Sequence, residues 1–153
     1  MMGSTPISRS KNMFEVKDKI IVSACLAGIP CNYKGEAKTN PQIVHLVATG
    51  KAIPVCPECL GGLPIPRTAA EQKEGKVITK NELDVTTEFN IGAQAVLEIA
   101  KENNCTVAIL KSKSPSCGKG QIYDGTFSGN LIDGNGITTN LLIKYPAKKN
   151  KPK

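Results

Sequence analysis

The chain has 153 residues, of which 40% are hydrophobic, and it carries a formal net charge of +7. Because domains commonly run to roughly 100 to 200 residues, this length predicts one domain whose core needs no disulfides. No apolar run approaches the roughly 18 residues of a membrane span, and residues 1–19 lack the apolar stretch of a signal sequence. We therefore expect a cytoplasmic protein with no membrane partner.

The positive charge lies at the two ends of the chain. Residues 144–153 hold five lysines and no acid, residues 1–20 hold four basic and two acidic side chains, and residues 21–143 hold eleven of each. A neutral body with 4% aromatic residues argues against a dedicated nucleic-acid groove. The lysine-rich end then adds at most a salt-sensitive attraction to RNA.

Three short runs rich in β-branched residues predict strands. They are "KIIVSAC" at 19–25, "KAIPVC" at 51–56 and "TVAILK" at 106–111. Pro54 cannot donate a backbone hydrogen bond, which favours an edge position or an irregular course for the second strand. The long stretch 57–85, rich in Pro and Gly, predicts a functional loop.

Three further segments have the signals of helices, namely 39–50, 86–104 and 136–145. In the second of them, Thr86 or Thr87 is expected to cap the start, and the Asn pair is expected to end the helix. Its apolar face is predicted to contain Phe89, Ala93, Val96, Leu97 and Ala100.

This alternation of strands and helices predicts a small, Rossmann-like, three-layer α/β domain with a mostly parallel sheet. We place the domain at 19–145, between a flexible N-terminal extension (1–18) and a basic tail (146–153). Open parallel sheets bind their ligands at the carboxyl ends of the strands, so the site is expected there.

Six cysteines in a reducing compartment point to metal binding or catalysis before disulfides. Cys25 ends the first predicted strand, Cys56 ends the second, and Cys117 lies on the loop that leaves the third. The carboxyl ends of parallel strands meet at one edge of a sheet, so we expect these three thiols to converge. Buried structural thiols are the alternative. Cys105 opens the third strand at its other end and is predicted to be a core residue.

The "CPEC" sequence at 56–59 leaves two other interpretations open. It is compatible with a thiol redox pair, or with a zinc site that uses Cys25, Cys31, Cys56 and Cys59. The redox interpretation requires a helix just after the first Cys, and "LGGLPIP" cannot form one. The zinc interpretation requires a spacing of about two to four residues, where Cys25 and Cys31 have five residues between them.

Four blocks of the chain occur in an order that is typical of one family. "SACLAGIPCNYKG", "PVCPECLGGLPIPR", "DVTTEF" before "IGA", and "AILKSKSPSCG" before "IYDGTF" together resemble the thiouracil desulfidase family over about residues 19–143. The resemblance implies a [4Fe-4S] cluster with one open iron, held by three cysteines that match Cys25, Cys56 and Cys117. It also implies that a thiolated pyrimidine such as 2-thiouracil is converted, without redox change, to uracil and sulfide.

The resemblance also assigns two catalytic residues, since the family's acidic residue matches Glu58 and its active-site serine matches Ser114. Glu58 is placed to move a proton during the attack of water, and Ser114 to form a hydrogen bond to the substrate ring or the water. A solvated loop charge and a turn residue before proline are their alternative roles. Ser112 and Ser116 are weaker candidates, expected to satisfy loop backbone.

The chain departs from the family at Cys59, where the family has an apolar residue, and after "LLIKY", where the family continues into a short strand. Arg67 is either a loop anchor or a contact for a substrate phosphate. Beside the desulfidase, the zinc or redox module and an RNA-associated protein acting on thiolated tRNA stay open. The oligomeric state, the sulfur acceptor and the choice among free base, nucleoside and nucleotide are also open.

Overall fold

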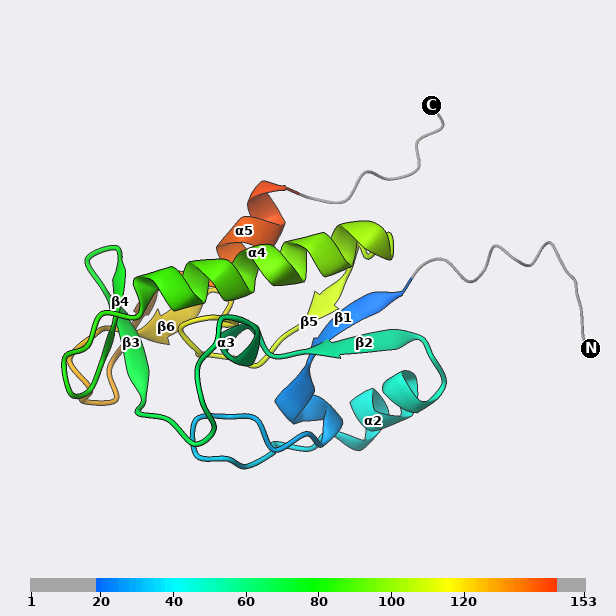
Figure 1. The fold of residues 1–153 in the computed structure, drawn as a ribbon, viewed down its shortest axis with the longest axis horizontal. Helices are drawn as coiled ribbons and strands as arrows, with labels where there is room; N and C mark the ends of the chain where they lie inside the picture. Colours follow the sequence, from blue (N-terminus) through cyan, green and yellow to red (C-terminus); the bar gives the residue numbers. More distant parts are fainter. Residues whose placement is uncertain (1–18, 146–153) are drawn as a thin grey trace, which may run out of the picture.

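The computed structural model describes residues 19–145, so the predicted N-terminal extension (1–18) and basic tail (146–153) lie outside the described residues. A three-stranded parallel sheet lies between helices, and two small hairpins lie together at one end of the domain (Figure 1). The predicted α/β class with a parallel sheet is confirmed. None of the helices in the described part is both long and apolar enough to span a membrane.

The strands form three separate sheets. The strands are β1 (Ile20–Ser23), β2 (Ala52–Val55) and β5 (Ala108–Ile109) in the parallel sheet, β3 (Ala70–Lys73) with β4 (Lys76–Thr79), and β6 (Gln121–Tyr123) with β7 (Leu131–Asp133). The helices are the 3-10 turn η1 (Ala24–Ala27), α2 (Pro41–Ala48), α3 (Pro57–Leu60), α4 (Thr86–Glu102) and α5 (Ile137–Lys144).

The parallel sheet has the order β2-β1-β5, so β1 is central and pairs with both neighbours. The edge position predicted for β2 from Pro54 is confirmed. Strand β5 is shorter at both ends than predicted. Beyond its carboxyl end, the backbone N–H of Lys111 donates to the side-chain oxygen of Ser23 at 2.8 Å instead of continuing the ladder.

Alternate residues of β1 face opposite helical layers, as the two-residue period of a strand requires. Ile21 packs in one core cluster with Val96 of α4 and with Cys105, which confirms the core position predicted for this cysteine. Val22 packs on the other side with Ile43 of α2. The helices thus cover both faces of the sheet and leave the carboxyl ends of its strands to the loops.

The start of α4 differs from the prediction that a threonine caps it. Val85 occupies the cap position, and Thr86 is already the first helical residue. The Thr86 hydroxyl instead accepts the backbone N–H of Val77 in β4 at 2.9 Å, and Asp84 accepts the backbone N–H of Thr86. The helix ends at Glu102 with Asn103 as its C-cap, in agreement with the predicted end at the Asn pair, and its predicted apolar face is buried.

The stretch 57–85 is not one loop, because it contains the short helix α3 and the β3–β4 hairpin. The prediction that no helix follows Cys56 is therefore wrong. Pro57 suits the first turn of a helix because its missing N–H needs no partner there, and the helix ends at Gly61 after one turn. The helix is made of the "PECL" residues themselves.

Two glycines let α3 and α4 touch through their backbones. A Cβ atom added to Gly61 would lie 2.0 Å from the carbonyl oxygen of Glu88, and one added to Gly92 would lie 1.8 Å from that of Pro57. No side chain can occupy either position without moving α3. The contact therefore sets the position of Cys56 and Glu58 relative to the helical layer.

We expect Gly92→Ala to lower the free energy of unfolding by about 1 to 3 kcal/mol, the usual cost of overpacking. The intrinsic helix propensity of alanine works in the opposite direction but is smaller, at roughly 1 kcal/mol. Thermal or urea unfolding measures the change, with Asn90→Ala on the exposed side of α4 as the control. Equal stability of the two variants would contradict the close contact.

Candidate functional site

The three cysteines singled out in the sequence lie around one cavity. Cys25 is in the 3-10 turn that follows β1, Cys56 directly follows β2, and Cys117 is on the loop after β5. All three line a cavity of about 620 Å³. The three thiols therefore come together near the carboxyl ends of the strands, as expected.

The Cys117 loop is held by the start of α5. The backbone N–H groups of Ile137 and Thr138 donate to the carbonyl oxygens of Pro115 and Ser116, at 2.9 Å each. The Thr139 hydroxyl donates to the carbonyl oxygen of Cys117 at 2.8 Å. The N–H groups in the first turn of a helix have no partner within the helix. The carbonyl oxygens of this loop accept them, and these hydrogen bonds hold the loop in place.

Burial favours the protonated form of these thiols in the metal-free protein. It raises the pKa of Cys117 to about 11, although hydrogen bonds from Ser23 and Ser116 work in the other direction. Burial also raises the pKa of Cys25, helped by the nearby Cys56 and opposed by Lys111. A bound metal group must therefore displace protons here.

The raised pKa of Cys117 predicts a pH dependence of the metal-free protein. The folded state holds this proton more tightly than the unfolded state, whose pKa is near the usual 9.0. The resulting stability is complete below pH 9 and is lost as the pH rises to 11, by about 2 to 3 kcal/mol at one pKa unit per 1.36 kcal/mol. Urea unfolding at pH 8 and pH 11 measures it. Cys117→Ala should show a smaller loss, and an equal loss would assign the effect to other groups.

Two more thiols lie beside Cys56. The carbonyl oxygen of Cys31 is 3.7 Å from the sulfur of Cys56 and 4.0 Å from that of Cys59. Burial raises the pKa of Cys31, and raises that of Cys59 to about 11. Within residues 19–145, however, no group of three His, Cys, Asp or Glu side chains is arranged to hold a single metal ion.

Glu58 lies on α3 and also lines the cavity. Both of its carboxylate oxygens accept hydrogen bonds, one from Nε of Arg67 at 2.8 Å and the other from the Ser116 hydroxyl at 2.9 Å. The side chains of Glu58 and Arg67 are 14% and 7% exposed, so this ion pair is largely shielded from water. A carboxylate bound in this way is fixed in direction as well as in charge.

Arg67 joins several segments around the thiols. Besides Glu58, its guanidinium donates to the carbonyl oxygens of Cys31 at 2.9 Å and Pro64 at 3.1 Å. Burial alone would lower the pKa of Arg67, but Glu58, together with Cys56 and Cys59, outweighs burial and raises it. Of the two roles open in the sequence, these contacts are those of a loop anchor.

Ser114 and Ser116 have different contacts in the structure from those expected. The Ser114 oxygen accepts the backbone N–H groups of Cys117 at 2.8 Å and of Ser116 at 3.1 Å, which holds the turn that carries Cys117. Ser116, which sequence reasoning ranked lower, is buried and contacts Glu58. Its place directly before a candidate ligand cysteine was the only sequence signal.

The cavity lining also includes cationic and aromatic side chains. Lys34, Lys38, Lys80, Lys111 and Lys113 line it, together with Tyr33, Tyr123 and Phe127. Glu58 and Glu71 are the acidic residues in this lining. Beside the thiols, the cavity therefore offers ammonium groups and aromatic rings to a ligand.

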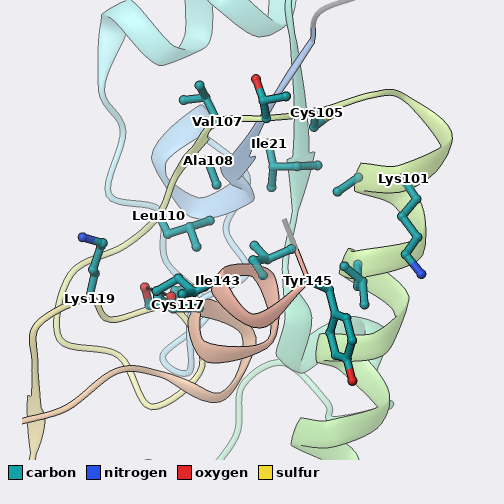
Figure 2. A pocket seen from close by; sticks show the side chains of 15 residues that line it. Ile21, Lys101, Cys105, Val107, Ala108, Leu110, Cys117, Lys119, Ile143 and Tyr145 are labelled. Atoms are coloured by element: carbon teal, nitrogen blue, oxygen red, sulfur yellow. Dashed lines mark hydrogen bonds between the residues drawn. The ribbon is translucent and has the colours of Figure 1, made fainter. Parts of the chain in front are cut away.

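A second cavity of about 490 Å³ lies between β5, α4 and α5 (Figure 2). Its labelled lining side chains are mostly apolar, among them Leu110 and Ile143, with Lys101 and Lys119 on either side. Cys117 lines both cavities, whereas Cys105 lines only this one. Since Cys25, Cys56 and Glu58 line the first cavity alone, the candidate site is there.

Comparison with known proteins agrees with the sequence blocks. A family model described as 2-thiouracil desulfurase matches residues 20–149. The uncharacterized protein YbbK of Bacillus subtilis (strain 168) is 45% identical, over 80% of this chain and 88% of that protein. A solved structure of the [4Fe-4S]-dependent thiouracil desulfidase TudS is similar with a TM-score of 0.81 and 45% identity, over 86% of this chain and 88% of that chain. The resemblance stated from the sequence is thus confirmed, and the chain belongs to the 2-thiouracil desulfurase family.

Proposed function

We propose that this protein hydrolyses a thiolated pyrimidine such as 2-thiouracil to uracil and sulfide, without redox change, at a [4Fe-4S] cluster held by Cys25, Cys56 and Cys117. One observation carries the proposal: Cys25, Cys56 and Cys117, from three distant segments, line a single cavity together with Glu58, and Cys31 lines it as well. The place of this cavity, at the carboxyl ends of parallel strands, is typical of ligand sites. The description of TudS as a [4Fe-4S]-dependent thiouracil desulfidase supports it.

The residues present fit such a cluster. Thiolates are its usual protein ligands, and the three candidates are buried or half-buried, in keeping with an iron site shielded from solvent. A tetrahedral zinc ion would draw its thiolates to roughly 3.8 Å from one another, given Zn–S bonds of about 2.3 Å. No such group is present in residues 19–145. The all-thiolate donor set is that of an iron–sulfur cluster, and Cys117, which a zinc site of Cys25, Cys31, Cys56 and Cys59 would not use, lines the same cavity.

When bound, a cluster with one iron left free by the protein would supply a thiophilic Lewis acid for the thione sulfur. Glu58 is then the group that takes the proton of the attacking water. Arg67 and Ser116 each occupy one of its carboxylate oxygens, which leaves a second lone pair on each oxygen for that proton. Glu58 is thereby ready to act without first having to be oriented.

Ser114 has a narrower role in this proposal than in the sequence interpretation. Its oxygen already accepts two backbone N–H groups, so the hydroxyl can serve only as a donor. It lines the cavity and keeps Cys117 in place. We propose that Ser114 contributes by holding this ligand and by donating its proton within the site.

The lining of the cavity bears on the kind of substrate. The lysines around the cavity attract anions, and the aromatic rings provide surfaces on which a base can stack. We propose that the preferred substrate carries a phosphate or another anionic group beside its thiolated base.

The test is anaerobic reconstitution with iron and sulfide, followed by metal and sulfide analysis and a visible spectrum. The expected product is a brown protein that bleaches in air and releases uracil from 2-thiouracil. A thiolated uridine monophosphate assayed in parallel should have the higher kcat/KM, and equal values would contradict the anionic substrate. Colourless protein with stoichiometric zinc and no labile sulfide would contradict the desulfidase and favour the zinc module.

The other interpretations have less support in the described residues. The zinc and redox modules rely on Cys31 and Cys59 and leave Cys117 and Glu58 without a role. Action on thiolated tRNA would rely on the lysine tail, which lies outside the described residues. A cytoplasmic location remains a prediction from the sequence.

A further inference from the structure

We infer that Ser116 is the positioning residue of Glu58: its hydroxyl fixes the direction of the carboxylate that receives the proton. The inference rests on the function proposed above and adds a residue to it. Ser116 is 3% exposed, and its oxygen lies 2.9 Å from Oε2 of Glu58. A carboxylate only accepts hydrogen bonds, so Ser116 is the donor.

The direction of the neighbouring hydrogen bond follows from this one. The oxygens of Ser114 and Ser116 are 3.1 Å apart, and either could donate on distance alone. Because the Ser116 proton is engaged with Glu58, Ser114 supplies the proton between the two serines. The result is an ordered chain from Ser114 to Ser116 to Glu58. The sulfur of Cys117 competes for the same Ser116 proton but is the more distant and weaker acceptor, at 3.7 Å from the Ser116 oxygen.

The backbone of Ser116 is held tightly enough to serve as a reference point. Its carbonyl oxygen accepts the N–H of Thr138 at 2.9 Å at the start of α5. Gly136 packs so closely that a Cβ atom there would lie 2.3 Å from the Ser116 carbonyl carbon. The donor therefore has a fixed position, whereas Glu58 comes from another element and has a side chain with three rotatable bonds.

Arg67 and Ser116 restrain Glu58 in complementary ways. Arg67 belongs to the same stretch of chain as Glu58 and binds Oε1. Ser116 belongs to the Cys117 loop, 58 residues away, and binds Oε2. Without Ser116, the carboxylate is free to turn about its bond to Arg67. A misplacement of about 1 Å can cost up to 100-fold in rate, so we expect a loss in kcat and not in binding.

The experiment compares Ser116→Ala and Ser116→Thr with Ser128→Ala, an exposed serine whose hydroxyl contacts Thr126 and Asn130 within its own turn. After reconstitution, iron and sulfide content, kcat and KM are measured. In Ser116→Ala we expect a normal cluster, an unchanged KM and a kcat reduced by about 10- to 100-fold. Ser116→Thr retains the hydroxyl and should recover most of kcat, and Ser128→Ala should match the wild type.

Infrared difference spectra provide a readout that does not depend on turnover. The antisymmetric carboxylate stretch of Glu58, identified by its absence in Glu58→Gln, should shift in Ser116→Ala and return towards its wild-type frequency in Ser116→Thr. If Ser116→Thr does not fold, the kcat and the infrared band of Ser116→Ala are sufficient to test the inference.

Three results would overturn the inference. They are wild-type kcat in Ser116→Ala, an unshifted carboxylate band, or loss of the cluster in Ser116→Ala with normal loading in Ser116→Thr, which would assign the hydroxyl to Cys117. If cluster-loaded wild type releases no uracil, the proposed function fails, and the infrared comparison still tests the contact with Glu58.

Discussion

Each of the variants Cys25→Ser, Cys56→Ser and Cys117→Ser is expected to retain no cluster after anaerobic reconstitution. Iron and labile sulfide should fall from about four of each per chain to background, and the visible absorption should disappear. A serine hydroxyl is a poor ligand for iron at neutral pH, and three ligands leave no redundancy. Uracil release should be lost in all three variants, because the thione sulfur would have no iron to bind.

Cys105→Ala is the matched control for these variants. It also removes a thiol next to the sheet, but Cys105 packs with Ile21 and Val96 and does not line the candidate cavity. It should load a complete cluster, with some loss of stability from the smaller side chain. Cys31→Ala should also load. Retention of metal by Cys117→Ala together with its loss in Cys31→Ala would contradict the proposed ligand set.

Cys59→Ala tests the departure from the family. Cys59 lies beside Cys56, since its thiol and that of Cys56 contact the same carbonyl oxygen of Cys31. It does not line the cavity. We therefore expect the alanine variant to retain its cluster. Partial loading of Cys56→Ser that disappears in the Cys56→Ser, Cys59→Ala double variant would identify Cys59 as a substitute ligand.

The positions of Cys25 and Cys56 could be predicted from the sequence because each follows closely on a strand. A β-branched run predicts a strand, and the residues just after it lie at the carboxyl end in any parallel sheet. Cys117 lies farther along its loop, and contacts with the start of α5 hold it there. The apolar face of α4 could be predicted in the same way, from its 3.6-residue period. The one-turn helix α3 could not, because four residues are too few to show a period. The Pro57 and Gly61 that bound the helix are also residues typical of a loop.

The contacts of Glu58 could not be predicted because they join residues from different elements. Ser116 is far from Glu58 in sequence, and its hydroxyl reaches the carboxylate only because α5 holds the loop. The same reason explains why the predicted threonine cap of α4 was wrong. Threonine is a common capping residue, but the Thr86 oxygen accepts the backbone N–H of Val77 in β4 instead. The partners of a polar side chain depend on which residues the fold brings near it. The period of apolar residues, in contrast, can be read directly from the sequence.

Glu58→Gln is expected to assemble a normal cluster and to lose at least about 100-fold in kcat, the usual scale for removal of a general base. Glutamine keeps the shape and one acceptor oxygen for Arg67, but its amide cannot take up a proton. The surface variant Glu102→Gln is the control for the loss of a negative charge. With the charge on Arg67 unpaired, Glu58→Gln should also unfold at lower urea concentration, so rates are compared at equal cluster content and well below the unfolding transition.

The kinetic pattern distinguishes the possible roles of this carboxylate. A fall in kcat with unchanged KM is typical of a contribution made only in the transition state, whereas a rise in KM alone would assign Glu58 to substrate binding. Glu58→Asp keeps the charge but draws the carboxylate back by one methylene from both Arg67 and Ser116. We expect it to lie between the wild type and Glu58→Gln, since the base is present but misplaced. Uracil release under anaerobic conditions is the measurement for all three. Near wild-type turnover in Glu58→Gln would reduce the carboxylate to an anchor for Arg67, and the proton acceptor would then have to be another group that lines the cavity.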